Sequence, residues 1–398
     1  MVCPLLTAGW QGQGKTGPEF KQNQGSEAMQ HCSPRQAIKW RSSKVQSNPV
    51  RRNKEIENTA LRYPRTEQPA EAQPVEIAPG VFWLYMPLPF ALDHINLWLL
   101  KDGDGWTAVD TGLYSSRVRD AWEAILPNFP LKRQIVTHFH PDHLGMAHWL
   151  QEKTGAPLWM TQGEYAVGQA VGHQIAGWAV PAMLDYFGRN GLDEARMQAL
   201  AERGNSYRKG VPDMPRSFMR LFDGGKVSID GHDWEVICGY GHSAEHASLY
   251  CAEQKLLISG DMLLPRITTN VNSFASTGED DPLGWFLNSI DRFLDLPEDT
   301  LVLPSHGLPF YGIATRVAQL KEHHQHRCDE LLAACQEQAQ SACDLIPVLF
   351  SREITDAHQA MFAMGESIAH LRHLEAQGKV RRVTEGTVEK FVANFVSS

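Results

Sequence analysis

Four side chains that commonly bind metal ions stand within six residues of one another, and this run constrains the fold more than any other feature of the chain. The run reads VTHFHPDHLG, and its candidate ligands are His138, His140, Asp142 and His143. It leaves a predicted strand over residues 134–137 and enters a predicted helix. Because sites in layered α/β proteins form where strands end, we expect these side chains to lie at such an edge.

The spacing within the run indicates two ions rather than one. Alternate residues of an extended chain point to the same side, so His138 and His140 can hold one ion together. Asp142 and His143 lie at the turn into the helix and face a neighbouring position. Imidazole and carboxylate ligands suit Zn²⁺, and they would also accept Fe or Mn.

Three more candidate ligands follow later predicted strands. His242 lies in GYGHS, Asp261 in SGD and His306 in PSHG. Small residues stand among or beside each of them and let a loop approach an ion closely. The sequence therefore offers seven candidate ligands from four segments of the chain.

Short strands and helices alternate around these segments. We expect strands at residues 81–85, 94–100, 106–109, 134–137, 226–229, 233–238, 247–251, 256–259 and 300–303, with helices at 116–126 and 282–294. This order predicts an α/β layered domain over residues 75–312.

A helical insertion over residues 161–222 interrupts that order and is placed where a lid over the site would lie. Its helical texture includes residues 176–187, which carry Trp178, Met183, Tyr186 and Phe187. They could form a wall for an acyl chain or ring, and the interpretation we favour slightly is that they form the core of the insertion itself.

The C-terminal region, residues 313–398, is predicted to hold a linker helix and a winged-helix-like domain. Residues 313–338 and 356–377 have helical periodicity, and the strands 379–384 and 387–391 flank a Glu385-Gly386 turn. Residues 1–74 differ in texture: they are rich in Gln, Ser, Asn, Lys and Arg, and we expect a disordered basic leader.

The ligand pattern H-x-H-x-D-H, followed by G-H-S, S-G-D and S-H-G, resembles the metallo-β-lactamase superfamily over about residues 76–312. The resemblance implies an αββα sandwich with the site along one edge. It implies that His138, His140 and His242 hold the first ion, that Asp142, His143 and His306 hold the second, and that Asp261 bridges the two. Asp110, in VDTG, matches the aspartate that supports the site in this family, and His246 is a candidate for orienting His242.

A two-metal site of this kind implies a hydrolase in which a bridging hydroxide attacks a carbonyl or phosphoryl centre. Asp142 would orient the nucleophile and shuttle a proton. The all-His/Asp ligand set is more similar to glyoxalase II, lactonases, thioesterases and nucleases than to the β-lactam-hydrolysing members, which often place other ligands at some of these positions.

Two functions of different classes follow. The first is hydrolysis of a small thioester or ester, such as an acyl-CoA, a glutathione thioester or a lactone. The second is cleavage of RNA, as in endoribonucleases of the lactamase-like type, with the winged helix binding nucleic acid. A non-hydrolytic diiron oxygen reductase is a third possibility, but it needs flavin or rubredoxin partners and the chain shows no Gly-rich nucleotide-binding loop.

Charge favours the small-molecule substrate and disfavours nucleic acid as a partner. The net charge is −9, and residues 1–75 hold eleven Lys/Arg against six Glu, a net of +5 that leaves about −14 on the remainder. From residue 342 to the end there are six Lys/Arg and seven Asp/Glu, whereas binding to a phosphate backbone depends on a basic excess on one face. The tail is then better interpreted as a packing, lid or dimerisation element, so a homodimer is possible.

Bulk features predict a cytoplasmic protein without a membrane partner. The seven cysteines are scattered and form no C-x-x-C pair, which is typical of reduced thiols in the cytosol. Neither a secretory signal nor an apolar run long enough to span a bilayer is expected.

Overall fold

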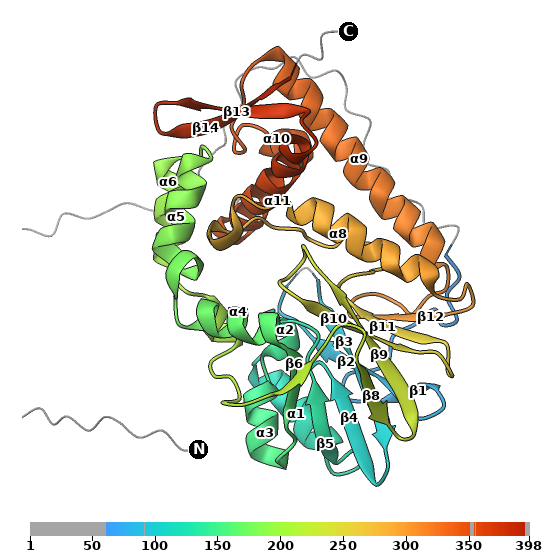
Figure 1. Ribbon diagram of the computed structural model, residues 1–398. Helices are drawn as coiled ribbons and strands as arrows, with labels where there is room; N and C mark the ends of the chain where they lie inside the picture. The colour runs from blue at the N-terminus through green and yellow to red at the C-terminus, as the bar shows by residue number, and fades with distance from the viewer. Residues whose placement is uncertain (1–60, 91, 351–353, 355, 395–398) are drawn as a thin grey trace, which may run out of the picture. The chain divides into compact units, whose positions relative to one another are not determined.

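Two β-sheets pack face to face in the computed structural model, which describes residues 61–90, 92–350, 354 and 356–394 (Figure 1). The first sheet has seven strands in the order β1 (Val75–Ala78), β2 (Val81–Pro87), β3 (His94–Asp102), β4 (Gly105–Val109), β5 (Leu131–Ile135), β6 (Leu158–Thr161) and β7 (Met219–Leu221). The second has five, in the order β12 (Leu301–Pro304), β11 (Leu256–Gly260), β10 (His246–Cys251), β9 (His232–Gly239) and β8 (Lys226–Ile229).

Alternation of side chains along the strands divides the core into layers. On β3, Trp98 and Leu100 point into the core between the sheets, whereas Leu97 and Leu99 point to the opposite face. Helices α1 (Ser116–Ile125) and α3 (Ala147–Thr154) cover that outer face of the first sheet. Helix α8 (Pro282–Asp291) packs against β9 of the second sheet. The predicted αββα sandwich is confirmed.

The helical insertion begins directly after β6 and ends at β7, two strands that pair in parallel. It contains α4 (Gln162–Gly172), the 3₁₀ helix η1 (Ala176–Trp178), α5 (Val180–Arg189), α6 (Glu194–Arg203) and α7 (Tyr207–Gly210). The single helical segment predicted over residues 176–187 is divided between η1 and α5. Pro181, in the first turn of α5, lacks the amide hydrogen that would continue the preceding turn.

The predicted C-terminal helices and hairpin are present. They are α9 (Ile313–Glu337), α11 (Ala357–Ala376) and the antiparallel pair β13 (Val380–Glu385) and β14 (Val388–Ala393), with a short additional helix, α10 (Ile346–Leu349), between the two long ones. Figure 1 shows these elements in orange and red beyond α8, and α11 packs against α8, α6 and α9. The C-terminal region therefore packs against helix α8 of the sandwich and helix α6 of the insertion.

The N-terminal boundary differs from the prediction on one point. Residues 1–60 lie outside the described residues. Residues 61–74, which the sequence assigned to the disordered leader, are placed against the sandwich: Leu61 is buried and the backbone of Arg62 pairs with that of Tyr311. Apolar burial and backbone pairing fix this stretch despite its polar composition.

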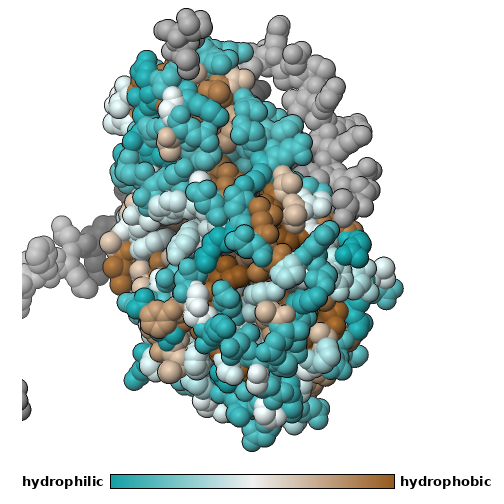
Figure 2. All heavy atoms as spheres, turned by 45° about the vertical axis from the view of Figure 1, so that its right-hand side comes forward, coloured by the Kyte–Doolittle hydropathy of each residue, from teal (hydrophilic) through white to brown (hydrophobic). Residues whose placement is uncertain are grey.

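The face in Figure 2 is mainly hydrophilic, and hydrophobic side chains reach it in separate areas. No helix in the described ranges is long and apolar enough to cross a membrane. The five cysteines within those ranges are buried and form no disulfide with one another.

Candidate metal centre

The seven predicted ligands meet at one edge of the sandwich. Residues 138–143 follow β5, His242 follows β9, Asp261 follows β11 and His306 follows β12. Strands β9, β11 and β12 run in the same direction within their sheet, so their carboxyl ends lie at the same edge. The structure thus brings together donors from four chain segments, in three overlapping groups of three.

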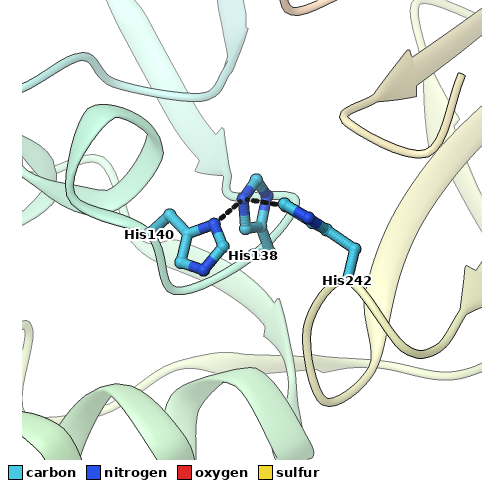
Figure 3. Close-up of side chains that lie close together, drawn as sticks. All are labelled: His138, His140 and His242. Atoms are coloured by element: carbon cyan, nitrogen blue, oxygen red, sulfur yellow. Dashed lines mark hydrogen bonds between the residues drawn. The ribbon is translucent and has the colours of Figure 1, made fainter. Parts of the chain in front are cut away.

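The first group consists of three imidazoles, His138, His140 and His242, whose ring nitrogens point toward one another (Figure 3). The Nε2 atom of His138 lies 2.9 Å from Nδ1 of His140 and 3.2 Å from Nε2 of His242. Three ring nitrogens converging in this way present the lone pairs that a single cation needs.

The second group consists of Asp142, His143 and His306, with Asp261 between the two groups. Oδ2 of Asp142 lies 3.5 Å from Nε2 of His306 and 3.7 Å from Nε2 of His143. Oδ1 of Asp261 lies 3.5 and 3.6 Å from the same two nitrogens, and its Oδ2 lies 3.5 Å from Nε2 of His242. One carboxylate therefore faces both groups with different oxygens.

These spacings fit a metal better than a network of hydrogen bonds. A tetrahedral site with metal–nitrogen distances of about 2.0–2.1 Å places its donor atoms about 3.4 Å apart. Moreover, Nε2 of His143 and Oδ1 of Asp261 are buried and have no hydrogen-bond partner among the described residues. Buried polar atoms without a partner are costly, and cations at this position would satisfy both of them.

Electrostatics separates the two groups. Burial, together with the neighbouring imidazoles, lowers the pKa of His138 and of His140 well below the ordinary value. Burial would lower the pKa of His143 as well, but the carboxylates of Asp110, Asp142 and Asp261 outweigh it and raise the pKa to about 10. The first group is thus neutral and ready to bind at neutral pH, while His143 holds a proton that a cation would displace.

Known proteins share this architecture. A solved beta-lactamase domain protein from Burkholderia ambifaria is 43% identical, with a TM-score of 0.79 over 85% of this chain and 99% of that one. Residues 91–306 match the family model described as the metallo-beta-lactamase superfamily. Residues 328–394 match a second model, described as the metallo-beta-lactamase-like C-terminal domain. The chain belongs to the metallo-β-lactamase superfamily.

Two further relatives extend over most of the chain. A metallo-beta-lactamase family protein from Thermus thermophilus is 30% identical, with a TM-score of 0.67 over 80% of this chain and all of that one. A probable metallo-hydrolase of Bacillus subtilis is 23% identical over 326 residues, which are 78% of this chain and 97% of that protein. The superfamily likeness therefore includes the C-terminal region as well as the sandwich.

Behind the ligands, Asp110 lies where the superfamily pattern predicts a supporting aspartate. Its Oδ2 accepts a hydrogen bond from Nδ1 of His143 at 2.8 Å, and its Oδ1 accepts one from the backbone amide of Thr137 at 2.8 Å. The backbone of Asp110 is left-handed, with φ of 63°, a conformation that aspartate tolerates better than most residues. Asp110 thereby sets the orientation of His143 and the start of the ligand loop.

The prediction for His246 needs correction. The sequence suggests that it orients His242, but its Nε2 instead accepts the backbone amide hydrogen of Asp261 at 3.1 Å. Gly260 makes this approach possible, because a Cβ at that position, where φ is 55°, would overlap the imidazole of His246. His246 therefore helps to hold Asp261.

Backbone carbonyl groups orient the other two imidazoles. Nδ1 of His242 donates to the carbonyl oxygen of Asn270 at 2.7 Å, and Nδ1 of His306 donates to that of His94 at 2.8 Å. Each hydrogen bond leaves Nε2 available for a cation. His94 thus orients His306 through its backbone carbonyl group, and Nε2 of its ring accepts the amide hydrogen of the next residue, Gly307, at 3.1 Å.

Glu164, at the start of α4, was not predicted from the sequence. The buried carboxylate accepts the amide hydrogen of Phe139 at 2.9 Å through Oε2, and the Ser243 hydroxyl and Glu245 amide, each at 2.6 Å, through Oε1. Burial raises the pKa of Glu164 to about 7. One side chain of the insertion therefore ties the loop that holds His138 and His140 to the loop after His242.

A second missed residue, Tyr207 of α7, acts on the same peptide. Its hydroxyl donates to the carbonyl oxygen of Phe139 at 2.7 Å. The insertion thus holds both backbone polar groups of Phe139, the residue between two candidate ligands. The location of the insertion suits a segment that positions the ligand loop as well as one that covers the site.

The C-terminal region also reaches the site. Oε2 of Glu366, on α11, accepts a hydrogen bond at 3.1 Å from the side-chain amide of Asn270, whose carbonyl group orients His242. Burial raises the pKa of Glu366 to about 7. The amide of Ser273, in the same loop, donates to the carbonyl oxygen of Gly365.

Proposed function

We propose that this metallo-hydrolase of the metallo-β-lactamase superfamily cleaves a small thioester or ester, such as an acyl-CoA, a glutathione thioester or a lactone. The observation that carries the proposal is the convergence of seven donor atoms beside a cavity of about 440 Å³, which His140 and Phe139 help to line. Pockets of this size are typical of sites for small organic ligands.

The donor set supports two ions, and Zn²⁺ is the species we propose, with Fe or Mn as alternatives. His138, His140 and His242 would hold one ion, Asp142, His143 and His306 the other, and Asp261 would face both. Such ions supply a nucleophile at neutral pH, by lowering the pKa of water, and polarise the substrate carbonyl.

Asp142 is our candidate for the catalytic carboxylate. Its side chain is 21% exposed, more accessible than that of Asp261 or of Asp110, which is enclosed behind His143. From that position Asp142 can accept a proton from the attacking water and release it to the leaving group. A thiolate needs little such help, since an ordinary thiol has a pKa of about 8.5, which favours a thioester.

Cleavage of RNA remains the alternative, and the C-terminal region gives it little support. Two of its arginines are committed to carboxylates: Arg372, whose side chain is 1% exposed, pairs with Glu279, Glu375 and Glu389, and Arg382 pairs with Glu279 and Glu375. These cations bind the hairpin to the rest of the fold. They are correspondingly less available to a phosphate backbone.

We further propose the domain division that the sequence suggested: a catalytic domain over 75–312 with the insertion 161–222 as lid, and a winged-helix-like unit within 313–398. The contacts of α11 with Asn270 and Ser273 support a structural role of that unit in the site. A homodimer through this region would leave that role unchanged.

Metal analysis coupled to a hydrolysis panel tests the proposal. Purified protein loaded with Zn²⁺, Fe or Mn is assayed with an acyl-CoA, a glutathione thioester, a lactone, a β-lactam and RNA. We expect about two ions per chain and turnover of a thioester or ester. His140→Ala and Asp261→Ala should lower metal content and activity together.

Matched controls are available on the surface. The side chain of His326 is 71% exposed and that of Asp104 is 92% exposed, and neither belongs to the centre. His326→Ala and Asp104→Ala should keep metal and activity. Full activity of a metal-depleted Asp261→Ala protein, or cleavage of RNA with no thioester or ester turnover, would contradict the proposal.

A further inference from the structure

Several parts of the chain line the cavity beside His140, and the loop at residues 272–275 is one of them. The loop that carries the candidate ligands contributes Phe139, the insertion contributes Trp178 and Met183, and helix α11 contributes Met361 and Phe362. The cavity thus borders the metal centre at His140. Its far walls come from segments that are distant in sequence.

The walls of this cavity are apolar and adaptable. Trp178 packs against Phe274 with ring centroids 5.1 Å apart and approaches Phe139 at 6.4 Å. The thioether side chains of Met183 and Met361 lie in the same lining. Methionine and aromatic side chains together form surfaces that accept varied apolar groups. By contrast Tyr186, which the sequence grouped with Trp178, directs its hydroxyl to Ser273 within the core.

Several polar side chains in the lining are engaged with the protein itself, whereas Oδ1 of Asn272 and Nδ1 of His358 are buried there without a hydrogen-bond partner among the described residues. Gln174 accepts the amide hydrogen of Val180, Asn205 donates to the carbonyl of Val171, and Ser273 bonds to Tyr186. A ligand with many polar groups would have to compete with these bonds. An uncharged, apolar group breaks none of these bonds when it enters.

Two cationic side chains lie at the lining without changing this balance. Lys209 is exposed, so its ammonium group is hydrated, and Nε of Arg203 donates to the Ser206 hydroxyl. A cation that binds an anionic substrate group inside a cavity is itself buried, and neither of these two side chains is buried in that way.

We propose that this cavity binds the acyl group of the substrate, and that the group is apolar and larger than acetyl, either a straight alkyl chain or an aromatic acyl group. The inference rests on the proposed function, because the scissile carbonyl must then lie at the metal centre beside His140. It also gives the C-terminal region a second role: helix α11 forms part of the specificity wall through Met361 and Phe362.

A chain-length series on the metal-loaded protein tests the assignment. Acyl-CoA substrates from acetyl to dodecanoyl, and phenylacetyl-CoA, are compared by kcat/KM. Each added methylene should raise kcat/KM about fourfold until the cavity is filled, after which the series levels. Succinyl-CoA, which carries a charge at similar length, should be poorer than butanoyl-CoA by about tenfold or more.

Variants locate the effect in the cavity. Trp178→Ala and Met361→Ala should each lower the preference for octanoyl over acetyl substrate by about tenfold or more. Trp285, on α8, is 44% exposed, and Met219, on β7, is 50% exposed; neither lines the cavity, so Trp285→Ala and Met219→Ala provide same-residue controls. Both controls should keep the preference of the parent protein.

Direct binding separates this inference from the proposed function. Butanoate, hexanoate and octanoate are titrated into metal-loaded protein by calorimetry. Tightening of about fourfold per methylene, lost in Trp178→Ala, supports the cavity even if no thioester or ester is cleaved. Equal affinity for butanoate, hexanoate and octanoate overturns the inference while leaving the proposed hydrolysis in place. Faster turnover of succinyl-CoA than of butanoyl-CoA does the same.

Discussion

At the scale of single residues, the two candidate ion positions differ in their protonation. His138 and His140 have lowered pKa values and are neutral at pH 7, whereas His143 has a pKa of about 10 because three carboxylates surround it. His306 shares this property in a milder form: burial is outweighed by Asp261, and the pKa is raised.

We therefore expect proton release to accompany only one of the two binding events. An ion at the His138, His140 and His242 position displaces no proton at pH 7. An ion at the Asp142, His143 and His306 position must displace the proton of His143, so its affinity should rise about tenfold per pH unit below pH 10. Calorimetry in buffers of different ionisation enthalpy counts the protons. Equal release at both steps would contradict this assignment.

The convergence of the candidate ligands was predictable from the sequence because each of the four segments that carry them follows a strand. The residue types and their positions after predicted strands can be read from the sequence. The three later candidates, His242, Asp261 and His306, also stand beside small residues. The partner of His246 was not predictable, because it depends on how the loop at Gly260 folds back onto β10.

At the scale of elements, the insertion holds the ligand loop. In the sequence, Thr161 and Glu164 have the T-x-x-E spacing of a capping box, a local device at a helix start. In the structure Thr161 donates to the Glu245 carbonyl instead, and the partners of Glu164 lie 25, 79 and 81 residues away along the chain. A local pattern carries no information about such distant partners, so the sequence could not reveal this role.

Removing these contacts should weaken metal binding. Glu164→Gln leaves one oxygen where two now accept hydrogen bonds, so we expect a loss of about 1–3 kcal/mol in unfolding free energy and a loss of metal affinity. Tyr207→Phe should have a smaller effect of the same kind. Competition with a chelator measures affinity, and urea denaturation measures stability.

Tyr165→Phe is the matched control for Tyr207→Phe. The hydroxyl of Tyr165 also donates from the insertion to a backbone carbonyl group, that of Pro215 at 2.8 Å, and its other hydrogen bond, from Gln169, does not involve the ligand loop either. Stability should fall in both variants, and metal affinity only in Tyr207→Phe. Equal loss of affinity in the two would show that the insertion acts through general stability alone.

At the scale of the whole molecule, α11 connects the C-terminal region to the metal centre through Glu366 and Asn270. The presence of two long helices and a hairpin was predicted from periodicity and turn residues. Their docking was not, because it depends on pairings such as Arg372 with Glu279, 93 residues apart. The sequence thus predicts the elements of this region, but not its part in the site.

Glu366 gives this connection a pH signature. Burial raises its pKa from 4.5 to about 7, so its contribution to stability is complete below pH 4.5 and is lost as pH rises through 7. In metal-free protein, the parent should lose about 3 kcal/mol of unfolding free energy relative to Glu366→Gln between about pH 4.5 and pH 8. Parallel urea titrations across this range measure the difference.

A surface carboxylate provides the control for this titration. The side chain of Glu322, on α9, is 74% exposed, so Glu322→Gln serves as the exposed-carboxylate control in the same measurements. If the unfolding free energies of the parent and of Glu366→Gln differ by the same amount at every pH, burial does not raise the pKa of Glu366.

The central claim is that two cations bind side by side at the sandwich edge, with Asp261 between them. Crystals of metal-loaded protein, measured at the absorption edge of the bound metal, test it directly. We expect two anomalous peaks about 3.5–4 Å apart, one among His138, His140 and His242 and the other among Asp142, His143 and His306. A single peak at full metal loading would contradict this claim, and so would two peaks without the Asp261 carboxylate between them.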